Sequence, residues 1–312
     1  MDEPAPGEMQ IEDVRRVAIV GAGTMGQQIG FQCAGHGYDV VLYDVDPSAL
    51  EAAKKRIEAY AEGLETGGAI TSELRVAAQA RIALTTDLRA AAQDADVLSE
   101  AVPEDPDLKG RVLAEFNSEC PPRTIFMTNT STLLPSQYAE RSGRGSRLLA
   151  LHFHIPVWIN NLADVMPHAG TAPAVTQLVL AFARRIGQVP IELRQEHNGY
   201  VFNSMYSALN SAAISLAQQG VASIEDIDRS WMHITKAPVG PLGALDAVGL
   251  DTVWTITDYW ARQLGDVQLR ANAAFLKEYV DRGDLGVKAG RGFYIYPDPA
   301  YAQPGFIKAP DS

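Results

Sequence analysis

Hydrophobic positions in the first 195 residues form short runs that are separated by longer amphipathic stretches. Eight of these runs have the length and apolar character of buried strands: Val17–Val20, Val40–Tyr43, Ile82–Leu84, Asp96–Val102, Thr124–Thr128, Leu148–Phe153, Leu162–Met166 and Val189–Leu193. Strands that are apolar throughout and alternate with helices are typical of a mostly parallel sheet covered on both faces. The pattern therefore predicts an α/β fold of the Rossmann type.

The alternation ends near Glu196. Beyond it, the segments 200–219, 224–234, 252–264 and 271–282 have helical patterns, and no strand alternates with them. A chain of 312 residues is long enough for two domains. We therefore predict a Rossmann domain over residues 1–195 and an all-helical C-terminal domain over residues 196–312. The Pro-rich ends, residues 2–7 and 298–312, are expected to be loose.

A glycine motif follows the first predicted strand directly. Gly21, Gly23 and Gly26 form the pattern Gly-x-Gly-x-x-Gly, with Thr24 and Met25 between the last two glycines. In a strand–turn–helix unit the first glycine permits a tight turn, the second lets the backbone approach a pyrophosphate, and the third lets the helix pack closely on the sheet. The N–H groups at the start of the helix then face the phosphates. The motif predicts a bound dinucleotide.

Asp44 ends the second predicted strand. A carboxylate at this point can accept hydrogen bonds from the ribose hydroxyls of the cofactor, and it repels a 2′-phosphate. The sequence therefore predicts NAD in preference to NADP. The alternative is that Asp44 only caps the next helix.

Charge, cysteine content and hydrophobicity limit the partners, metal sites and location that we expect for this protein. The formal net charge is -12, and an acidic protein repels a phosphate backbone, so nucleic acid is not expected as a partner. The two cysteines, Cys33 and Cys120, form no Cys-x-x-Cys pair, so no metal site is expected. Residues 1–16 are acidic and lack the apolar core of a secretory signal, and no apolar run approaches the ~20 residues of a membrane span. We expect a cytoplasmic protein.

An ordered set of motifs resembles the L-3-hydroxyacyl-CoA dehydrogenase family from about Val17 to Tyr296. Besides the glycine motif, the matching segments are Ser99–Glu104 with Lys109, Asn129–Ser131, Leu151–Phe153, Gly199–Asn203, Pro238–Leu242, Gly249–Asp251 and Lys288–Tyr294. Each motif is weak by itself, but their order is specific. The resemblance implies a homodimer formed through the helical domain and an enzyme of fatty acid metabolism.

The resemblance also implies catalytic roles. His152 corresponds to the general base, and a histidine suits this role because its ordinary pKa lies near neutrality. Asp164 corresponds to the carboxylate that orients the imidazole, Ser131 to the serine that hydrogen-bonds the reacting oxygen, and Asn203 to the asparagine that holds the substrate carbonyl. Residues that match cofactor-contacting positions, in addition to the glycine motif and Asp44, are Glu104, Lys109, Asn129 and Lys288.

The chain departs from the family near the predicted base. The family carboxylate is usually Glu, so Asp164 is one methylene shorter. The family pattern His-Phe-Phe-Asn-Pro is replaced by His152-Phe153-His154-Ile155-Pro156, and the missing Asn normally helps to hold the nicotinamide. His154, Asn160 or Asn161 are candidates to replace it.

The sequence leaves open whether the substrate is attached to CoA. The positions that correspond to CoA contacts are Tyr60 and Gly67, in an acidic neighbourhood. The basic cluster Lys54–Arg56 is a candidate phosphate anchor, although a solvated helix face explains it as well. The leading hypothesis is therefore oxidation of a short-chain (S)-3-hydroxyacyl-CoA. The alternatives are a dehydrogenase of a small free 3-hydroxy substrate, similar to relatives that act on L-gulonate or carnitine, and a non-catalytic NAD-binding protein.

Overall fold

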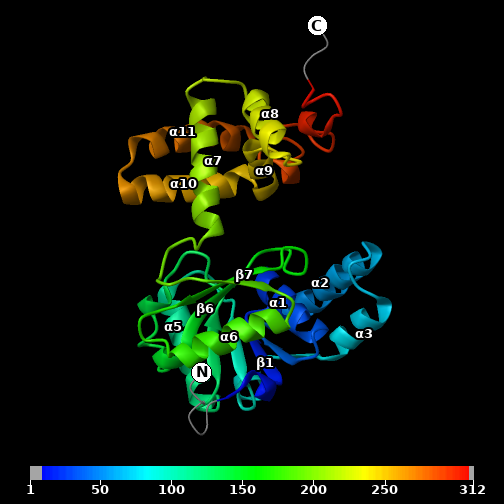
Figure 1. Ribbon diagram of the computed structural model, residues 1–312, viewed down its shortest axis with the longest axis vertical. Coiled ribbons are helices and arrows are strands. Elements are labelled where there is room, and N and C mark those ends of the chain that lie inside the picture. Colours follow the sequence, from blue (N-terminus) through cyan, green and yellow to red (C-terminus); the bar gives the residue numbers. More distant parts are fainter. Residues whose placement is uncertain (1–8, 309–312) are drawn as a thin grey trace. The chain divides into compact units, whose positions relative to one another are not determined.

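The computed structural model describes residues 9–308 and divides into two compact units, Met1–Val201 and Phe202–Ser312 (Figure 1). The division lies slightly beyond the boundary predicted after residue 195, because the intervening segment packs on the first unit. Glu196 accepts a hydrogen bond from the backbone of Ser136, and the Tyr200 ring stacks on His152. The predicted loose end at residues 2–7 lies outside the described residues.

The first unit is built on one eight-stranded sheet with the order β3-β2-β1-β4-β5-β6-β7-β8. The strands are β1 (Arg16–Val20), β2 (Asp39–Tyr43), β3 (Ile82–Thr85), β4 (Val97–Glu100), β5 (Ile125–Thr128), β6 (Leu148–Phe153), β7 (Leu162–Pro167) and β8 (Val189–Glu192). Strands β1 to β6 are parallel, β7 pairs antiparallel with β6, and β8 is parallel to β7. The order reverses between β1 and β4, which is where sheets of this type bind ligands.

Helices cover both faces of this sheet, and the alternation along β1 shows why its run is apolar throughout. Val17 and Ile19 belong to the core under α1, α2 and α6, whereas Ala18 and Val20 belong to the core under α4 and α5. The helices of this unit are α1 (Thr24–Gly35), α2 (Pro47–Thr66), α3 (Ser72–Ala80), α4 (Leu88–Ala92), α5 (Pro106–Glu119) and α6 (Pro173–Arg185). The predicted fold class is confirmed. Among the described residues, no helix is long and apolar enough to cross a membrane.

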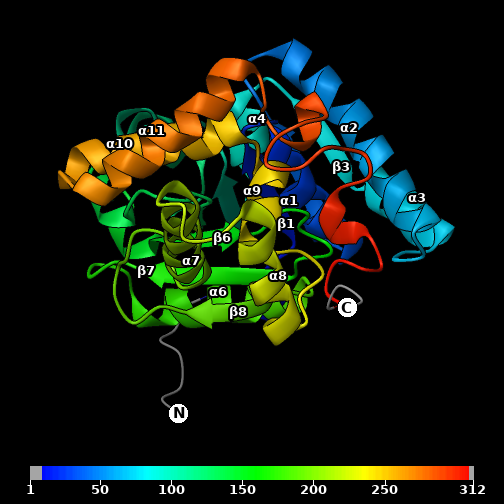
Figure 2. The same ribbon diagram turned by 90° about the horizontal axis from the view of Figure 1, so that it is seen from above.

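The second unit consists of helices around a small core. Its helices are α7 (Phe202–Gln218), α8 (Ile224–Thr235), α9 (Pro241–Val248), α10 (Leu250–Leu264) and α11 (Val267–Arg282). Helices α10 and α11 lie side by side, and Figure 2 shows this pair from above. The core residues Leu242, Leu245, Leu250 and Leu276 are at most 3% exposed.

Two buried carboxylates tie the end of the chain to these helices. Asp228 accepts hydrogen bonds from the first backbone N–H groups of α9 and from the Tyr294 hydroxyl. Asp246 accepts from the backbone N–H groups of Phe293 and Tyr294 at 2.9 Å each. The expectation of a loose end from residue 298 is wrong for its described part, because Phe306 is 7% exposed and its carbonyl accepts a hydrogen bond from Arg229.

Candidate active site

The glycine loop between β1 and α1 has the geometry of a dinucleotide cradle. Gly21 has a φ of +105°, and a Cβ there would lie 2.7 Å from the carbonyl oxygen of Ala101. A Cβ on Gly26 would overlap the carbonyl oxygen of Gly21, so helix and loop meet without side chains between them. Apart from its chain neighbours, no atom of residues 9–308 lies within 4 Å of a Cβ placed on Gly23, so the space above the loop is open. The residues therefore fit the pyrophosphate of a dinucleotide, with the first turn of α1 facing it.

Asp44 holds the glycine loop against the end of β2. Its Oδ2 accepts a hydrogen bond from the Ala22 backbone at 2.8 Å, and its Oδ1 accepts from the Asp46 backbone at 3.0 Å. Arg56 on α2 reaches the same loop and donates to the Ala22 carbonyl at 3.2 Å and to Gln27 at 2.9 Å. The structure thus places Asp44 beside the predicted cofactor loop. It also places Arg56, a candidate CoA anchor, there.

Glu104 organises the loop that follows β5. Its Oε1 accepts hydrogen bonds from the backbone N–H groups of Ser131 and Thr132 at 2.8 and 2.9 Å, and from the Thr130 hydroxyl. Burial by itself would raise the pKa of Glu104. The hydrogen bond from Thr130, the charge of Lys109 and the two backbone N–H groups outweigh burial and leave the pKa below its ordinary value. A charged Glu104 therefore fixes the backbone that carries Ser131.

Lys109 lies beneath this loop and is 1% exposed. Its ammonium group donates to Glu100 Oε1 at 2.7 Å and to the Val102 carbonyl at 3.0 Å, and it lies 3.4 Å from Glu104. The structure therefore shows Lys109 supporting the end of β4 and Glu104 from within the protein. Its predicted contact with the cofactor stays a prediction.

A cavity of about 280 Å³ brings several predicted residues together at the carboxyl end of the sheet. It is lined by Met25, Ala101, Val102, Glu104, Asn129, Ser131 and Thr132. These residues come from α1, from the end of β4 and from the end of β5. Because parallel strands end at one edge of a sheet, segments far apart in sequence meet there.

Asn129 joins this cavity to the next strand. Its Oδ1 accepts a hydrogen bond from the Phe153 backbone at 2.9 Å, beside His152. The side chain that resembles a cofactor-contacting position therefore also sets the end of β6.

His152 and Asp164 form a buried pair across β6 and β7. The two residues are direct partners in the antiparallel register, and His152 Nδ1 lies 3.2 Å from Asp164 Oδ2. Burial by itself would raise the pKa of the Asp164 carboxyl, but hydrogen bonds and charge from His152 and His154 outweigh it and lower the pKa. A carboxylate only accepts hydrogen bonds, so this contact assigns the proton of the neutral imidazole to Nδ1 of His152 and leaves the lone pair on Nε2. This arrangement suits a general base.

Tyr200 packs against His152 and was not predicted as a site residue. Its ring stacks on the His152 ring with centroids 4.5 Å apart and planes 4° apart. Its hydroxyl donates to the Thr130 carbonyl at 2.6 Å. Tyr200 therefore links the His152 ring to the Ser131 loop. Tyr200 belongs to the motif Gly199–Asn203, which resembles the family, but the resemblance implied a site role for Asn203 alone.

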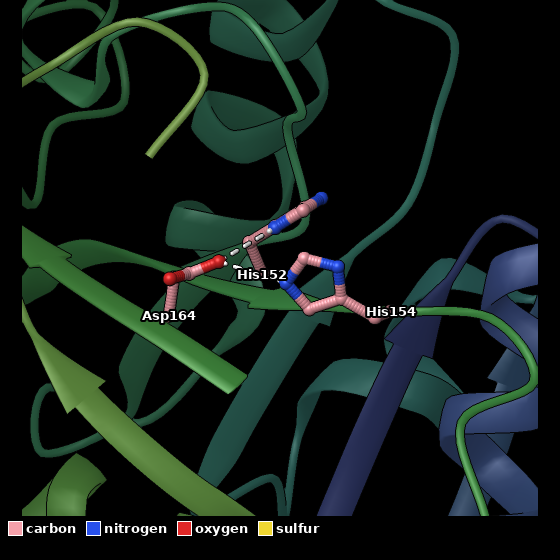
Figure 3. Close-up of side chains that lie close together, drawn as sticks. All are labelled: His152, His154 and Asp164. Carbon is pink, nitrogen blue, oxygen red and sulfur yellow. Dashed lines mark hydrogen bonds and ion pairs between the residues drawn. The ribbon is translucent and has the colours of Figure 1, made fainter. Parts of the chain in front are cut away.

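His154 contacts the same carboxylate and was also missed as its partner. Its Nε2 lies 2.9 Å from Asp164 Oδ2, and Figure 3 shows both imidazoles directed at this one oxygen. The spacing His-x-His at a strand end, which places both side chains on one face, was the available signal. Asn160 and Asn161 are the other candidates to replace the family asparagine. Their side-chain amides donate hydrogen bonds to the carbonyls of Ile155 and Gly187, respectively.

Two predicted residues belong to the second unit. Asn203 lies in the first turn of α7 and is half-buried. Lys288 donates to both carboxylate oxygens of Asp251 at 2.6 Å. Their roles toward the substrate and the cofactor stay predictions.

Comparisons with known proteins agree with this geometry. Residues 16–196 match the NAD binding domain of 3-hydroxyacyl-CoA dehydrogenase, and residues 199–296 match its C-terminal domain. A probable 3-hydroxybutyryl-CoA dehydrogenase of Bacillus subtilis is 33% identical over 92% of this chain and 99% of its own length. A 3-hydroxybutyryl-CoA dehydrogenase of Mycobacterium tuberculosis is 30% identical over 91% of this chain and 99% of its own.

Solved structures show the same architecture. A diketoreductase that acts on dicarbonyl compounds superposes with a TM-score of 0.84 and is 43% identical, covering 91% of this chain and 99% of the other. The (S)-3-hydroxybutyryl-CoA dehydrogenase of Ralstonia eutropha superposes with a TM-score of 0.82 at 29% identity, covering 91% and 100%. The predictions of an NAD cofactor and of a dehydrogenase are thereby confirmed. The chain belongs to the 3-hydroxyacyl-CoA dehydrogenase family, whose members are NAD-dependent oxidoreductases that act on CH–OH groups.

Proposed function

We propose that this protein oxidises the 3-hydroxyl group of a short-chain (S)-3-hydroxyacyl-CoA to the ketone, with His152 as the general base. The observation that carries the proposal is the buried pair of His152 and Asp164 at the carboxyl edge of an NAD-binding sheet. The matching relatives named as 3-hydroxybutyryl-CoA dehydrogenases support the substrate class. A non-catalytic NAD-binding protein would have no need of such a pair.

In the proposed reaction His152 Nε2 takes the proton of the substrate hydroxyl while Asp164 stabilises the imidazolium that forms. Bound NAD supplies the acceptor for the hydride that leaves the same carbon. The C–O single bond thereby becomes a carbonyl, and the proton of the hydroxyl lies on His152. Tyr200 holds the imidazole ring in plane, which keeps Nε2 directed at one position.

Ser131 and Asn203 are the proposed substrate-binding groups. The Ser131 side chain is exposed, and Glu104 fixes its backbone, so its hydroxyl is available to hydrogen-bond the reacting oxygen. Asn203 is the proposed donor to the carbonyl two bonds from the hydroxyl-bearing carbon. A donor there favours a 3-hydroxyacyl group over a simple alcohol, because only the former has a carbonyl to hold.

A second candidate is a small free hydroxy or dicarbonyl substrate without CoA. The Tyr60 hydroxyl accepts a hydrogen bond from the Trp158 backbone at 3.0 Å, so this CoA-equivalent position is occupied within the protein. Arg56 is engaged at the glycine loop. The 43% identity to a diketoreductase supports the same candidate, since reduction of a ketone is the reverse of the proposed reaction.

The discriminating experiment compares kcat/KM for 3-hydroxybutyryl-CoA with values for free 3-hydroxybutyrate, L-gulonate and carnitine, and for a small diketone in the direction of reduction. NADH absorbance is the readout. We expect the thioester to be the best substrate. A higher kcat/KM for any free compound would replace the acyl-CoA assignment by the second candidate.

Lys54 and Lys55 allow a further test of whether the enzyme binds the CoA part of a thioester substrate. Both are exposed on α2. If they bind CoA phosphates, the double charge reversal Lys54→Glu/Lys55→Glu raises KM for the thioester and leaves KM for NAD unchanged. The matched control is Arg75→Glu on α3, where the wild-type arginine pairs with Glu65. Homodimerisation and a cytoplasmic location complete the proposal and rest on the sequence.

A further inference from the structure

His154 gives the catalytic pair a third member that the proposed reaction does not require. The side chains of His152, His154 and Asp164 are 5%, 14% and 0% exposed. Each contributes one nitrogen or oxygen atom, and these atoms all lie within 4.8 Å of one another. We propose that these three residues form a reversible site for a divalent cation of the zinc type, and that the bound cation inhibits the enzyme. The inhibitory half of this proposal rests on the proposed role of His152, whereas the binding half does not.

The distances suit a metal ion with little rearrangement. A tetrahedral zinc ion with bonds of about 2.0–2.1 Å holds its ligand atoms about 3.4 Å apart. Asp164 Oδ2 lies 3.2 Å from His152 Nδ1 and 2.9 Å from His154 Nε2. The three ligand atoms lie within 4.8 Å of one another, so small side-chain rotations that bring all three separations to about 3.4 Å place the ion between the side chains drawn in Figure 3.

The donor set also suits zinc rather than calcium or magnesium. Two imidazole nitrogens and one carboxylate oxygen are typical of Zn²⁺ and related transition metals, whereas Mg²⁺ and Ca²⁺ take oxygen ligands. Within the described structure Asp164 Oδ1 is buried and has no hydrogen-bond partner, so the carboxylate has unused acceptor capacity. Water can be the fourth ligand, as it is in zinc sites with three protein ligands.

Occupation of this site would disable the base. A cation on His152 Nδ1 takes the place of the proton that Asp164 orients. The neutral imidazole that binds the cation then carries its one proton on Nε2, so Nε2 has no lone pair with which to accept the substrate proton. Asp164 is at the same time engaged by the cation and no longer stabilises an imidazolium.

The binding test uses purified enzyme that has been dialysed against EDTA and then against chelator-free buffer. Zn²⁺ is titrated by calorimetry, and Co²⁺ is titrated by visible absorption, because tetrahedral Co²⁺ absorbs far more strongly than octahedral Co²⁺. We expect one strong site per chain in the wild type. Loss of a ligand in His154→Phe weakens binding by at least about tenfold, since even outer partners of a metal site contribute 10–100-fold. His233→Phe, which removes an exposed histidine on α8, keeps the wild-type affinity.

Asp164→Asn provides a second ligand variant in case His154→Phe does not fold, and circular dichroism checks both. Absence of a strong Co²⁺ or Zn²⁺ site in the wild type, or equal affinity in wild type and folded ligand variants, overturns the binding site.

The inhibition test compares each protein with its own metal-free activity. Zn²⁺ is expected to inhibit the wild type and His233→Phe at the concentration at which it binds, EDTA to restore the activity, and His154→Phe to resist inhibition by at least about tenfold. Stoichiometric binding without inhibition overturns the inhibitory half alone. Because calorimetry needs no substrate, a wrong choice of substrate class would leave the binding result intact.

Discussion

His152 and Asp164 are direct cross-strand partners in the antiparallel pair of β6 and β7. They are twelve residues apart in sequence, and the turn between the two strands brings their side chains to 3.2 Å. Because cross-strand partners keep a fixed spacing, the carboxylate orients the imidazole without help from a flexible loop. Asp164, although one methylene shorter than the usual family residue, therefore reaches His152.

Replacement of the base tests the centre of the proposed mechanism. We expect His152→Ala to lower kcat by about 10²–10⁴-fold, the range typical of a lost general base. The glycine loop is built from other segments, so the Kd for NADH, measured by fluorescence, is expected to stay near the wild-type value. Near-wild-type kcat would remove His152 from the mechanism.

Asp164→Asn tests the pair separately from the base. The amide keeps the shape of the side chain but loses its charge, and it can favour the wrong imidazole tautomer. We expect kcat to fall by at least about tenfold while KM changes little, because the lost interaction matters most when the imidazolium forms. The conservative variant Asp164→Glu, which carries the usual family residue, should retain more activity than Asp164→Asn. The reverse order would contradict an electrostatic role.

Cofactor preference follows from Asp44 at the end of β2. The carboxylate already accepts hydrogen bonds from the loop that cradles the pyrophosphate, and it repels a 2′-phosphate. We expect a higher kcat/KM with NAD than with NADP, and a smaller ratio in Asp44→Asn. Equal kcat/KM values of the wild type with NAD and NADP would show that Asp44 does not determine the cofactor preference.

Glu104 predicts a pH dependence of stability. Its pKa in the folded protein lies below the ordinary value of about 4.3, so its contribution is present above that value and is lost as the pH falls through the folded-state pKa. The free energy of unfolding of Glu104→Gln should therefore differ most from the wild type near neutral pH, and the difference should shrink below about pH 4. Urea unfolding at several pH values measures this. A difference that is constant with pH would mean that the carboxylate charge contributes nothing.

Exposed apolar side chains on α10 support the predicted homodimer. Ile256 is 52% exposed and Tyr259 is 55% exposed, whereas the partly buried Trp254 packs against the core of the second unit, with the Lys277 ammonium group over its ring. We expect a dimer by light scattering at micromolar concentration and a monomer for Ile256→Glu/Tyr259→Glu, because aromatic and apolar anchors dominate such interfaces. Val221→Glu, at an exposed turn of the same unit, is the control. A monomeric wild type would end the dimer hypothesis.

The strands and the cofactor loop could be predicted from the sequence, because each depends on local rules. His152 was named from the family resemblance, and its role as general base stays a prediction. A strand buried on both faces must be apolar throughout, and a loop that meets both a helix and a pyrophosphate needs glycine at fixed positions.

What the tertiary structure alone decided is which side chains share a partner. Strand register places His154 on the carboxylate already used by His152, and the approach of the segment after β8 places the Tyr200 ring on that imidazole. Burial of Lys109 beneath Glu104 makes this residue a support of the Ser131 loop, whatever contact it makes with the cofactor. The contacts of Tyr200 with His152 and of Glu104 with the Ser131 loop join segments that lie far apart along the chain. They depend on strand pairing and packing, which are set by the whole fold rather than by the pattern of any one segment.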